Sequence, residues 1–256
     1  MKLSVTLITL NEEANIRQAL ESARWADEIV VVDAFSTDRT VAICREYTDR
    51  VFQHPWSGFA AQKNLALREA RGEWVFSLDA DERIPPSLAE EIRRVVADDG
   101  PCDGYFVPRK NYFAGRWIRH GGWYPDHTLR LFRRSKGRFL PRAVHEAVQI
   151  QDGRVGYLRH ALEHYTYASV SDYLTRMDRY STLAAQEMAC QGRRARIADL
   201  VLRPPAVFLK AYVLRGGFLD GLDGLVLAGL GAAYAFAKYA KLREIQARDG
   251  EAPASP

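Results

Sequence analysis

The sequence predicts an α/β fold with a mostly parallel central sheet flanked by helices, followed by a helical appendage. Three observations predict it. Short β-type runs alternate with helical segments over about the first 100 residues, which is the pattern of βαβ units. Polar residues follow several of these runs, at the position where open α/β sheets bind ligands. After about residue 168 the chain becomes helical, and from residue 200 it is apolar with basic flanks.

The alternating pattern sets out the elements of the first half in order. Strands are expected at 3–10, 29–32, 50–53 and 74–78, and helices at 11–25, 40–47, 58–70 and 87–98. Right-handed crossovers bring the carboxyl ends of parallel strands to one edge of the sheet. Asn11, Asp33 and Asp79 are therefore expected to gather at that edge, although they are far apart in the sequence.

The acidic stretch after the strand at 74–78 is the most informative part of the chain. Asp79, Asp81 and Glu82 follow that strand within four positions. On an extended backbone, residues two apart leave the chain on the same side, so Asp79 and Asp81 are expected to face one cation. Oxygen ligands of this kind suit Mg²⁺ or Mn²⁺ shared with the phosphates of a substrate. The alternative is an acidic strand-to-helix turn, with Pro85 opening the next helix.

Other polar residues near the same edge suit a nucleotide. Asp33 can accept hydrogen bonds from a base or ribose, and the turn that contains Ser36 can receive anionic groups through its amides. Lys63 can reach a phosphate, or it can be a solvated surface lysine. Asn11 and Ser36 also have a simpler alternative, which is to cap the helices that follow them.

Composition limits the class of protein. The 256 residues are 47% apolar and 27% charged, which fits one large α/β domain or one domain with an appendage. The net charge of +4 is too small to argue for a nucleic-acid partner. The three cysteines are far apart, which favours a reducing compartment. The N-terminus lacks the pattern of a signal peptide, so a cytoplasmic location is expected.

Three segments resemble motifs of the family 2 glycosyltransferases of the GT-A (Rossmann-like) fold. They are Thr-Leu-Asn-Glu (9–12), Val-Val-Asp-Ala-Phe-Ser-Thr-Asp-Arg-Thr (31–40) and Leu-Asp-Ala-Asp-Glu (78–82). Gln-Lys-Asn (62–64) and Gly-Glu-Trp (72–74) fit the same pattern. The resemblance covers about the first 100 residues. It implies a nucleotide-sugar donor, with a UDP-sugar favoured, a divalent metal at the Asp-x-Asp, and inversion at the sugar carbon.

The resemblance also implies roles for individual side chains. Thr9, Asn11 and Glu12 would line the nucleotide pocket, Asp33 would contact the base, Asp79 the ribose or sugar, and Asp81 the metal. One departure stands out, because many members of the family have a second Asp where this chain has Ala34. Base recognition is therefore expected to depend more heavily on Asp33.

The catalytic domain is expected to span 1–168, with the nucleotide-sugar half at about 1–100 and the acceptor half at about 101–168. In the acceptor half, the aromatic segment 111–123 suits sugar faces, and a buried aromatic loop is the alternative. A strand is expected at 128–134. On it, Arg130 and Arg133 are candidates for binding the donor diphosphate or an anionic acceptor, with surface arginines as the alternative.

Glycosyl transfer needs a base that takes the proton from the acceptor hydroxyl. Glu146 is the candidate base, and Asp126 and His145 are the other candidates. Asn-Tyr-Phe (111–113), Gly-Gly-Trp-Tyr-Pro-Asp (121–126) and Val-His-Glu (144–146) resemble the branch near the lipopolysaccharide core heptose β-glucosyltransferases. In that branch the His-Glu stands where other branches have their catalytic Glu-Asp. The alternative is that His145 and Glu146 only shape the acceptor wall.

Residues 169–246 are expected to form a helical region, and 247–256 a disordered tail. The longest uncharged piece, 224–237, would cover about 21 Å as a helix, which is too short for a bilayer core of about 30 Å. Basic-flanked apolar helices of this length can lie in the membrane interface. Packing on the catalytic domain or a homodimer interface is the alternative.

Together these features predict an inverting hexosyltransferase on the cytoplasmic face of the inner membrane. It would transfer a sugar to a glycolipid of the lipopolysaccharide core or a related envelope glycan. A polyprenyl phosphate or protein acceptor stays open, as does a nucleotide-sugar-binding membrane protein without turnover. A nucleotidyltransferase would share the architecture, but no Gly-rich loop bearing Arg or Lys follows Leu10.

Overall fold

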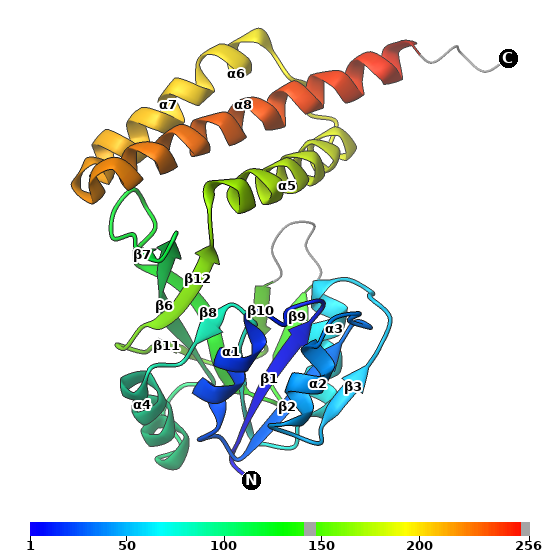
Figure 1. The fold of residues 1–256 in the computed structure, drawn as a ribbon, viewed down its shortest axis with the longest axis vertical. Coiled ribbons are helices and arrows are strands. Elements are labelled where there is room, and N and C mark those ends of the chain that lie inside the picture. Colours follow the sequence, from blue (N-terminus) through cyan, green and yellow to red (C-terminus); the bar gives the residue numbers. More distant parts are fainter. Residues whose placement is uncertain (141–146, 252–256) are drawn as a thin grey trace, which may run out of the picture. The chain divides into compact units, whose positions relative to one another are not determined.

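The computed structural model describes residues 1–140 and 147–251. The chain divides into two compact units (Figure 1). The first unit contains residues 1–110 and 125–165, and the second contains 111–124 and 166–256. The aromatic segment that the sequence placed in the catalytic domain is thus grouped with the C-terminal helices.

A sheet with helices on both faces forms the first unit (Figure 1). Its first half contains β1 (Leu3–Thr9), α1 (Ile16–Ala23), β2 (Glu28–Asp33), α2 (Thr40–Arg45), β3 (Val51–Gln53), α3 (Phe59–Glu69), β4 (Trp74–Ser77), β5 (Glu82–Arg83) and α4 (Pro86–Ala97). The later strands are β6 (Gly104–Phe113), β8 (Asp126–Arg133), β9 (Gly137–Leu140), β10 (Ala147–Ile150), β11 (Val155–Tyr157) and β12 (Leu162–Tyr167). The α/β fold class that the sequence predicts is confirmed.

The strand order of the large sheet is β3-β2-β1-β4-β8-β6-β12-β5. Strands β3, β2, β1 and β4 pair parallel with one another. Strand β8 runs antiparallel to both β4 and β6. The parallel part is therefore the N-terminal half of the sheet, where helical crossovers connect the strands as parallel pairing requires.

Alternate side chains of the strands enter two separate cores. Trp74 and Phe76 of β4 pack with α1, α2 and α4 on one face, whereas Val75 packs with α3 on the other. Leu131 and Phe132 of β8 divide between the same two cores. Because helices cover both faces, the central strands are apolar on both sides, which explains their continuous β-type runs.

The second unit is mainly helical. It contains β7 (Arg116–Trp117), α5 (Val170–Cys190), α6 (Ile197–Val201), α7 (Arg203–Leu209), a π-helix (Lys210–Leu214), a 3₁₀ helix (Gly217–Asp220) and α8 (Gly221–Glu251). Phe113 and Ile118 of the aromatic segment are buried against Leu227 of α8. Part of that segment is therefore the buried aromatic loop that the sequence left as an alternative.

The C-terminal helix is longer than the sequence analysis predicted. Helix α8 has 31 residues, which is about 46 Å at 1.5 Å per residue. By length and composition alone, the helical span Gly217–Arg248 is sufficient to cross a membrane. The prediction that this region is too short was wrong because it counted only the uncharged piece, and the helix continues through Lys238 and Lys241. The tail predicted from residue 247 is also helical as far as Glu251.

Candidate active site

The carboxyl ends of β1, β2 and β4 meet at one edge of the sheet, as the sequence predicts. Thr9 is in register with Asp33, and the Thr9 hydroxyl donates a hydrogen bond of 3.0 Å to the Asp33 carboxylate. The Leu78 amide, just after β4, donates to the Thr6 carbonyl at 3.0 Å. The loops that follow these strands therefore surround a common region.

Hydrogen bonds join the loop after β1 to the loop after β2. The Asn11 amide donates to the Ser36 hydroxyl at 2.8 Å, and the Asn11 side-chain oxygen accepts from the Thr37 amide at 2.8 Å. The Glu12 amide donates to the Thr40 hydroxyl at 2.8 Å. Helix α1 begins only at Ile16, so the alternative in which Asn11 caps that helix is wrong. Asn11 instead has a φ of 54° and links the two loops.

The Asp33 carboxylate is fully buried. It accepts hydrogen bonds from the Thr9 hydroxyl, from the amide and hydroxyl of Ser36, and from the Gln53 side chain. Four donors satisfy most of its hydrogen-bonding capacity inside the protein. In this arrangement Asp33 orders the loop that contains Ser36, and the Ser36 side chain does not cap α2.

Two exposed apolar side chains at this edge were missed by the sequence analysis. Leu10 is 45% exposed and Phe35 is 52% exposed. Phe35 has a φ of 60°, a conformation that side chains with a Cβ rarely adopt and that often marks functional sites. The available sequence signal was an aromatic residue in a polar turn.

The acidic turn differs from the prediction. Strand β4 ends at Ser77, and the Glu82 amide donates to the Asp79 carbonyl at 3.0 Å, which closes a turn. The prediction of an extended backbone that points Asp79 and Asp81 the same way was therefore wrong. The Asp79 carboxylate contacts the Lys63 amine, whereas the Asp81 carboxylate lies 3.5 Å from Nε2 of His164.

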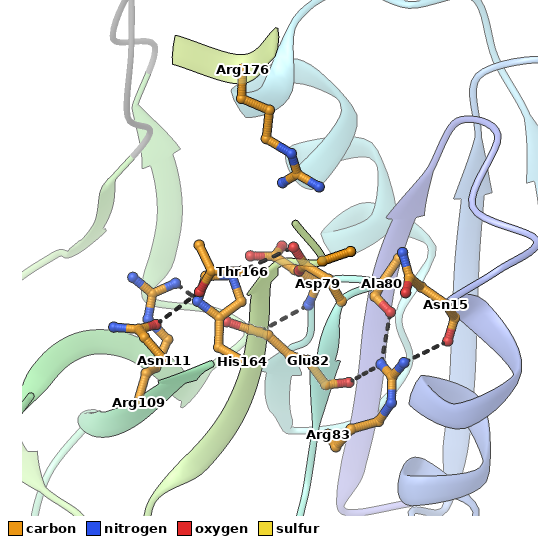
Figure 2. A network of polar contacts seen from close by, with 12 residues as sticks. Asn15, Asp79, Ala80, Glu82, Arg83, Arg109, Asn111, His164, Thr166 and Arg176 are labelled. Carbon is orange, nitrogen blue, oxygen red and sulfur yellow. Dashed lines mark hydrogen bonds and ion pairs between the residues drawn. The ribbon is translucent and has the colours of Figure 1, made fainter. Parts of the chain in front are cut away.

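Alternating charges extend from Asp79 into the first unit. Figure 2 shows Asp79, Glu82 and Arg109 within this network. Asp79 lies 2.9 Å from Lys63 and 2.5 Å from Arg130. Arg130 also contacts Glu82 at 2.5 Å, and Arg109 lies 3.3 Å from Glu82. Lys63, Arg130 and Glu82 are buried, so the surface alternatives for Lys63 and Arg130 are wrong.

The network extends to one of the candidate bases. Arg109 donates to the Asp126 carboxylate from two nitrogens, at 2.5 and 3.1 Å. One of the candidate bases is therefore ion-paired with a cation of the protein.

The opposite charges of Asp79 and Arg130 each shift the pKa of the other group toward its ionised form. Burial alone would raise the pKa of Asp79, but Arg130 and Lys63 outweigh it and hold that pKa well below its usual range. Burial would likewise lower the pKa of Arg130, and the charges of Asp79 and Glu82 raise it instead. Asp79 and Arg130 are therefore both ionised at neutral pH. The buried Nε of Arg130 has no hydrogen-bond partner within the described residues.

Three consecutive residues of α3 contact three different parts of the first unit. Gln62 donates to the carbonyls of His54 and Pro55, and Lys63 contacts Asp79. Asn64 exchanges two hydrogen bonds, of 2.8 and 3.0 Å, with the backbone of Phe139 in β9. Successive side chains on a helix point about 100° apart, which explains the three directions.

The candidate base Glu146 lies outside the described residues, as does His145, one of the two other candidates. The segment that contains them is bounded by β9 and β10, which pair with Leu140 opposite Ala147. Asn64 anchors β9, and its neighbour Lys63 contacts Asp79. Strand β9, which comes directly before these residues, is therefore tied through α3 to the acidic turn.

Two further arginines have structural roles. Arg83 donates to the carbonyls of Ala80 and Asn15, at 2.8 and 2.9 Å, and thereby ties the acidic turn to the start of α1 (Figure 2). Arg133 pairs with Asp99 at 2.5 Å and lies over the Trp74 ring. The prediction that Arg133 binds an anionic substrate has no support from these contacts.

The fit of a divalent cation depends on Asp81 and His164. Among the residues that the structure describes, no group of three or more His, Cys, Asp or Glu side chains is placed to hold a metal ion. Mg²⁺ often binds through one or two protein ligands and takes its remaining ligands from water and substrate phosphates. The Asp81 carboxylate and the His164 imidazole fit a site of that kind, whereas cations already occupy both oxygens of Asp79.

Comparison with known proteins agrees with the fold. Residues 4–165 match the model of glycosyl transferase family 2. The chain is similar to a lipopolysaccharide core biosynthesis glycosyltransferase, LpsC, from Rhizobium meliloti, with 36% identity over 94% of this chain and 92% of that protein. An uncharacterised glycosyltransferase from Rickettsia felis is 30% identical over 95% of this chain and 90% of that protein.

Solved structures share the fold at low sequence identity. The mannosyltransferase PcManGT from Pyrobaculum calidifontis, in complex with GDP-Man and Mn²⁺, has a TM-score of 0.56 at 18% identity and covers 94% of this chain and 86% of that one. S. aureus TarS 1–349 in complex with UDP has a TM-score of 0.50 at 20% identity and covers 99% of this chain and 93% of that one.

The fold and the acidic edge thus define a glycosyltransferase of the GT-A type. The chain belongs to glycosyl transferase family 2. The hypothesis of a binding protein without turnover has no support from this membership.

The charge network makes a prediction about stability. Asp79→Asn should lower the free energy of unfolding at pH 7 by about 3 kcal/mol, because the buried Lys63 and Arg130 lose a partner. The folded-state pKa of Asp79 is lowered from 3.8, so its contribution is complete above about pH 4 and is lost as the pH falls further. The measurement is urea denaturation of both proteins at pH 7 and about pH 3. A difference that stays constant with pH would contradict this role.

Proposed function

We propose that the protein is an inverting glycosyltransferase that transfers a sugar from a UDP-sugar to a hydroxyl group of a membrane-borne glycolipid, in lipopolysaccharide core synthesis. The charge network around Asp79 at the carboxyl edge of the sheet is the observation that carries the donor assignment. The acceptor assignment draws on the similarity to LpsC over nearly the whole length of both chains.

The donor would bind across the joined loops after β1 and β2. Backbone and side-chain groups of Thr9, Asn11 and Glu12 would border the nucleotide, and Asp33 would act on the base through the loop that it orders. Leu10 and Phe35 offer exposed apolar surfaces on which a base can stack. The sugar would lie toward Asp79, whose carboxylate is 28% exposed.

The reaction would be a direct displacement at the anomeric carbon. The acceptor oxygen forms a bond to that carbon while the bond to the diphosphate oxygen breaks, and the configuration inverts. Glu146 would take the acceptor proton, as a base within hydrogen-bond reach does. Lys63 and Arg130 would keep Asp79 ionised and in place. A divalent cation held by Asp81 and His164 would offset the charge of the departing diphosphate.

The C-terminal unit would place the enzyme on the cytoplasmic surface of the inner membrane. Its α6, α7 and the following π-helix expose large apolar side chains, which are Ile197, Val201, Leu202, Leu209, Val213 and Leu214. Exposed apolar surface of this extent, next to basic residues, is typical of segments that lie in a membrane interface. A glycolipid acceptor explains why a sugar transferase needs that surface.

The first test addresses the donor and the cation. UDP at about 100 times its dissociation constant should stabilise the protein by roughly 2.7 kcal/mol, in the presence of Mn²⁺ or Mg²⁺ and not with a chelator. Asp81→Ala and His164→Ala should lose the metal-dependent part of this shift. Glu163→Gln, next to His164 in β12, is the matched control and should retain it. A thermal-shift panel of nucleoside diphosphates gives the readout, and equal shifts in all three variants would contradict the cation assignment.

A second test addresses the base. Glu146→Gln should lower the transfer rate by a factor of about 10² to 10⁴ while UDP binding stays unchanged, because only proton removal is affected. Single-turnover transfer to a lipopolysaccharide acceptor is the measurement. Asp126→Asn removes the other candidate carboxylate, which is the one that pairs with Arg109, and therefore distinguishes the two candidates. Near-normal transfer in Glu146→Gln together with its loss in Asp126→Asn would assign the base to Asp126.

A third test addresses Phe35. Phe35→Gly should raise the free energy of unfolding by about 1 kcal/mol, because glycine adopts a positive φ without strain, and should weaken UDP binding. Asp152→Gly is the matched control, since Asp152 also has a positive φ, of 46°, in a turn outside the donor region. That variant should gain stability with unchanged UDP affinity. Calorimetric titration and thermal melts of both variants provide the comparison, and unchanged UDP affinity in Phe35→Gly would exclude a stacking role.

A further inference from the structure

A groove between α7 and α8 is lined entirely by residues of the second unit. It has an empty volume of about 490 Å³. Its lining residues are Arg203, Ala206, Val207, Lys210, Ala235, Lys238 and Tyr239. The four residues from the α7 side follow the spacing i, i+3, i+4, i+7, and the three from α8 follow i, i+3, i+4. Each set therefore forms one face of its helix.

Three cations line this groove, and only one of them has a carboxylate partner in the described part of the chain. Arg203 pairs with Asp199 at 2.5 Å and lies over the Tyr239 ring, 4.9 Å from its centre. The Lys238 amine lies 5.3 Å from the centre of the same ring. Lys210 and Lys238 have no ion pair with any described residue. The groove therefore concentrates positive charge that the protein itself leaves largely uncompensated.

The surroundings of Lys238 also indicate uncompensated positive charge in the groove. Partial burial and then the like charges of Arg203 and Arg193 lower the pKa of Lys238. A bound anion would oppose both effects, because it offsets the repulsion and compensates the lost hydration. The chemistry of the groove thus favours an anionic group such as a phosphate.

Apolar surface borders the cations. Ala206, Val207 and Ala235 line the groove itself. Along the same segment, Leu202, Leu209 and Leu214 are each more than half exposed. A small soluble anion would account for the cations but would leave this apolar surface unexplained. A phospholipid supplies both parts, a phosphate headgroup and acyl chains.

We propose that the groove between α7 and α8 binds the phosphate headgroup of an anionic phospholipid, through Lys210, Lys238 and Arg203. The acyl chains would lie along the neighbouring apolar side chains, with the helices in the plane of the interface. This inference rests on the proposed membrane location of the second unit. It does not depend on the identity of the donor or the acceptor.

The test uses the full chain and vesicles of phosphatidylcholine, alone or with added phosphatidylglycerol, in sedimentation assays at fixed salt. The groove variant is Lys210→Gln with Lys238→Gln. The control variant is Arg194→Gln with Arg243→Gln, which removes the same charge from exposed positions that do not line the groove. Affinity for anionic vesicles should fall about tenfold further in the groove variant than in the control, as expected for lost hydrogen bonds to a charged group. Equal losses would indicate diffuse attraction and overturn the proposal.

Three further outcomes separate the sources of binding. If glycerol phosphate alone stabilises the wild-type protein, while its vesicle binding is the same with and without phosphatidylglycerol, the ligand is a soluble phosphate. Binding to vesicles that survives high salt and alkaline carbonate in every variant would mean that α8 spans the membrane. A dimer that forms without vesicles, and that Leu214→Ser disrupts, would assign the apolar surface to a second copy. Each of these overturns the headgroup site.

The result can be read independently of the transferase assignment. The groove variant should retain the metal-dependent shift with UDP, because none of its residues lies at the catalytic edge. If neither the wild-type protein nor the groove variant shows the shift with UDP, the donor assignment fails and the vesicle comparison still stands. If only vesicle discrimination fails, the headgroup site is wrong and the donor assignment stands.

Discussion

The arrangement of the candidate active site in the first unit depends on one interaction, in which Lys63 and Arg130 neutralise the carboxylate of Asp79. These three side chains come from the acidic turn, from α3 and from β8, so one carboxylate in contact with two cations joins three elements. Charges that are buried together are costly to separate. The same contact therefore holds the turn in place and keeps a negative group at the edge of the sheet, where the donor sugar is proposed to bind.

The two aspartates of the acidic turn have different partners. Asp79 is bound by cations of the protein, while Asp81 lies beside His164 of β12. A cation shared with a substrate can then be held by few protein ligands, and the affinity for metal would depend on the nucleotide being present. Glu82, fully buried between Arg130 and Arg109, extends the network from β8 to β6.

The helices of the second unit leave most of their apolar surface exposed. Within the apolar window of the span Gly217–Arg248, only 22% is buried. A soluble monomer rarely tolerates such a surface. A membrane interface would cover it, and the basic groove between α7 and α8 would then select lipids by charge. This arrangement would keep the enzyme at the surface where its proposed glycolipid acceptor is found.

The sequence by itself determined the α/β class, the order of the first strands and helices, and the edge at which polar residues gather, because periodicity and parallel connection rules act locally. It also determined that the chain becomes helical after about residue 168, where α5 begins at Val170. Only the tertiary structure decided which groups face each other: that Lys63 and Arg130 are buried on Asp79, that Asp33 turns inward to Ser36, and that His164 lies beside Asp81. These pairings join residues up to about 80 positions apart, and a pattern within one segment carries no information about its distant partner. The length of α8 was likewise misjudged, because charge interrupts an apolar run without ending a helix.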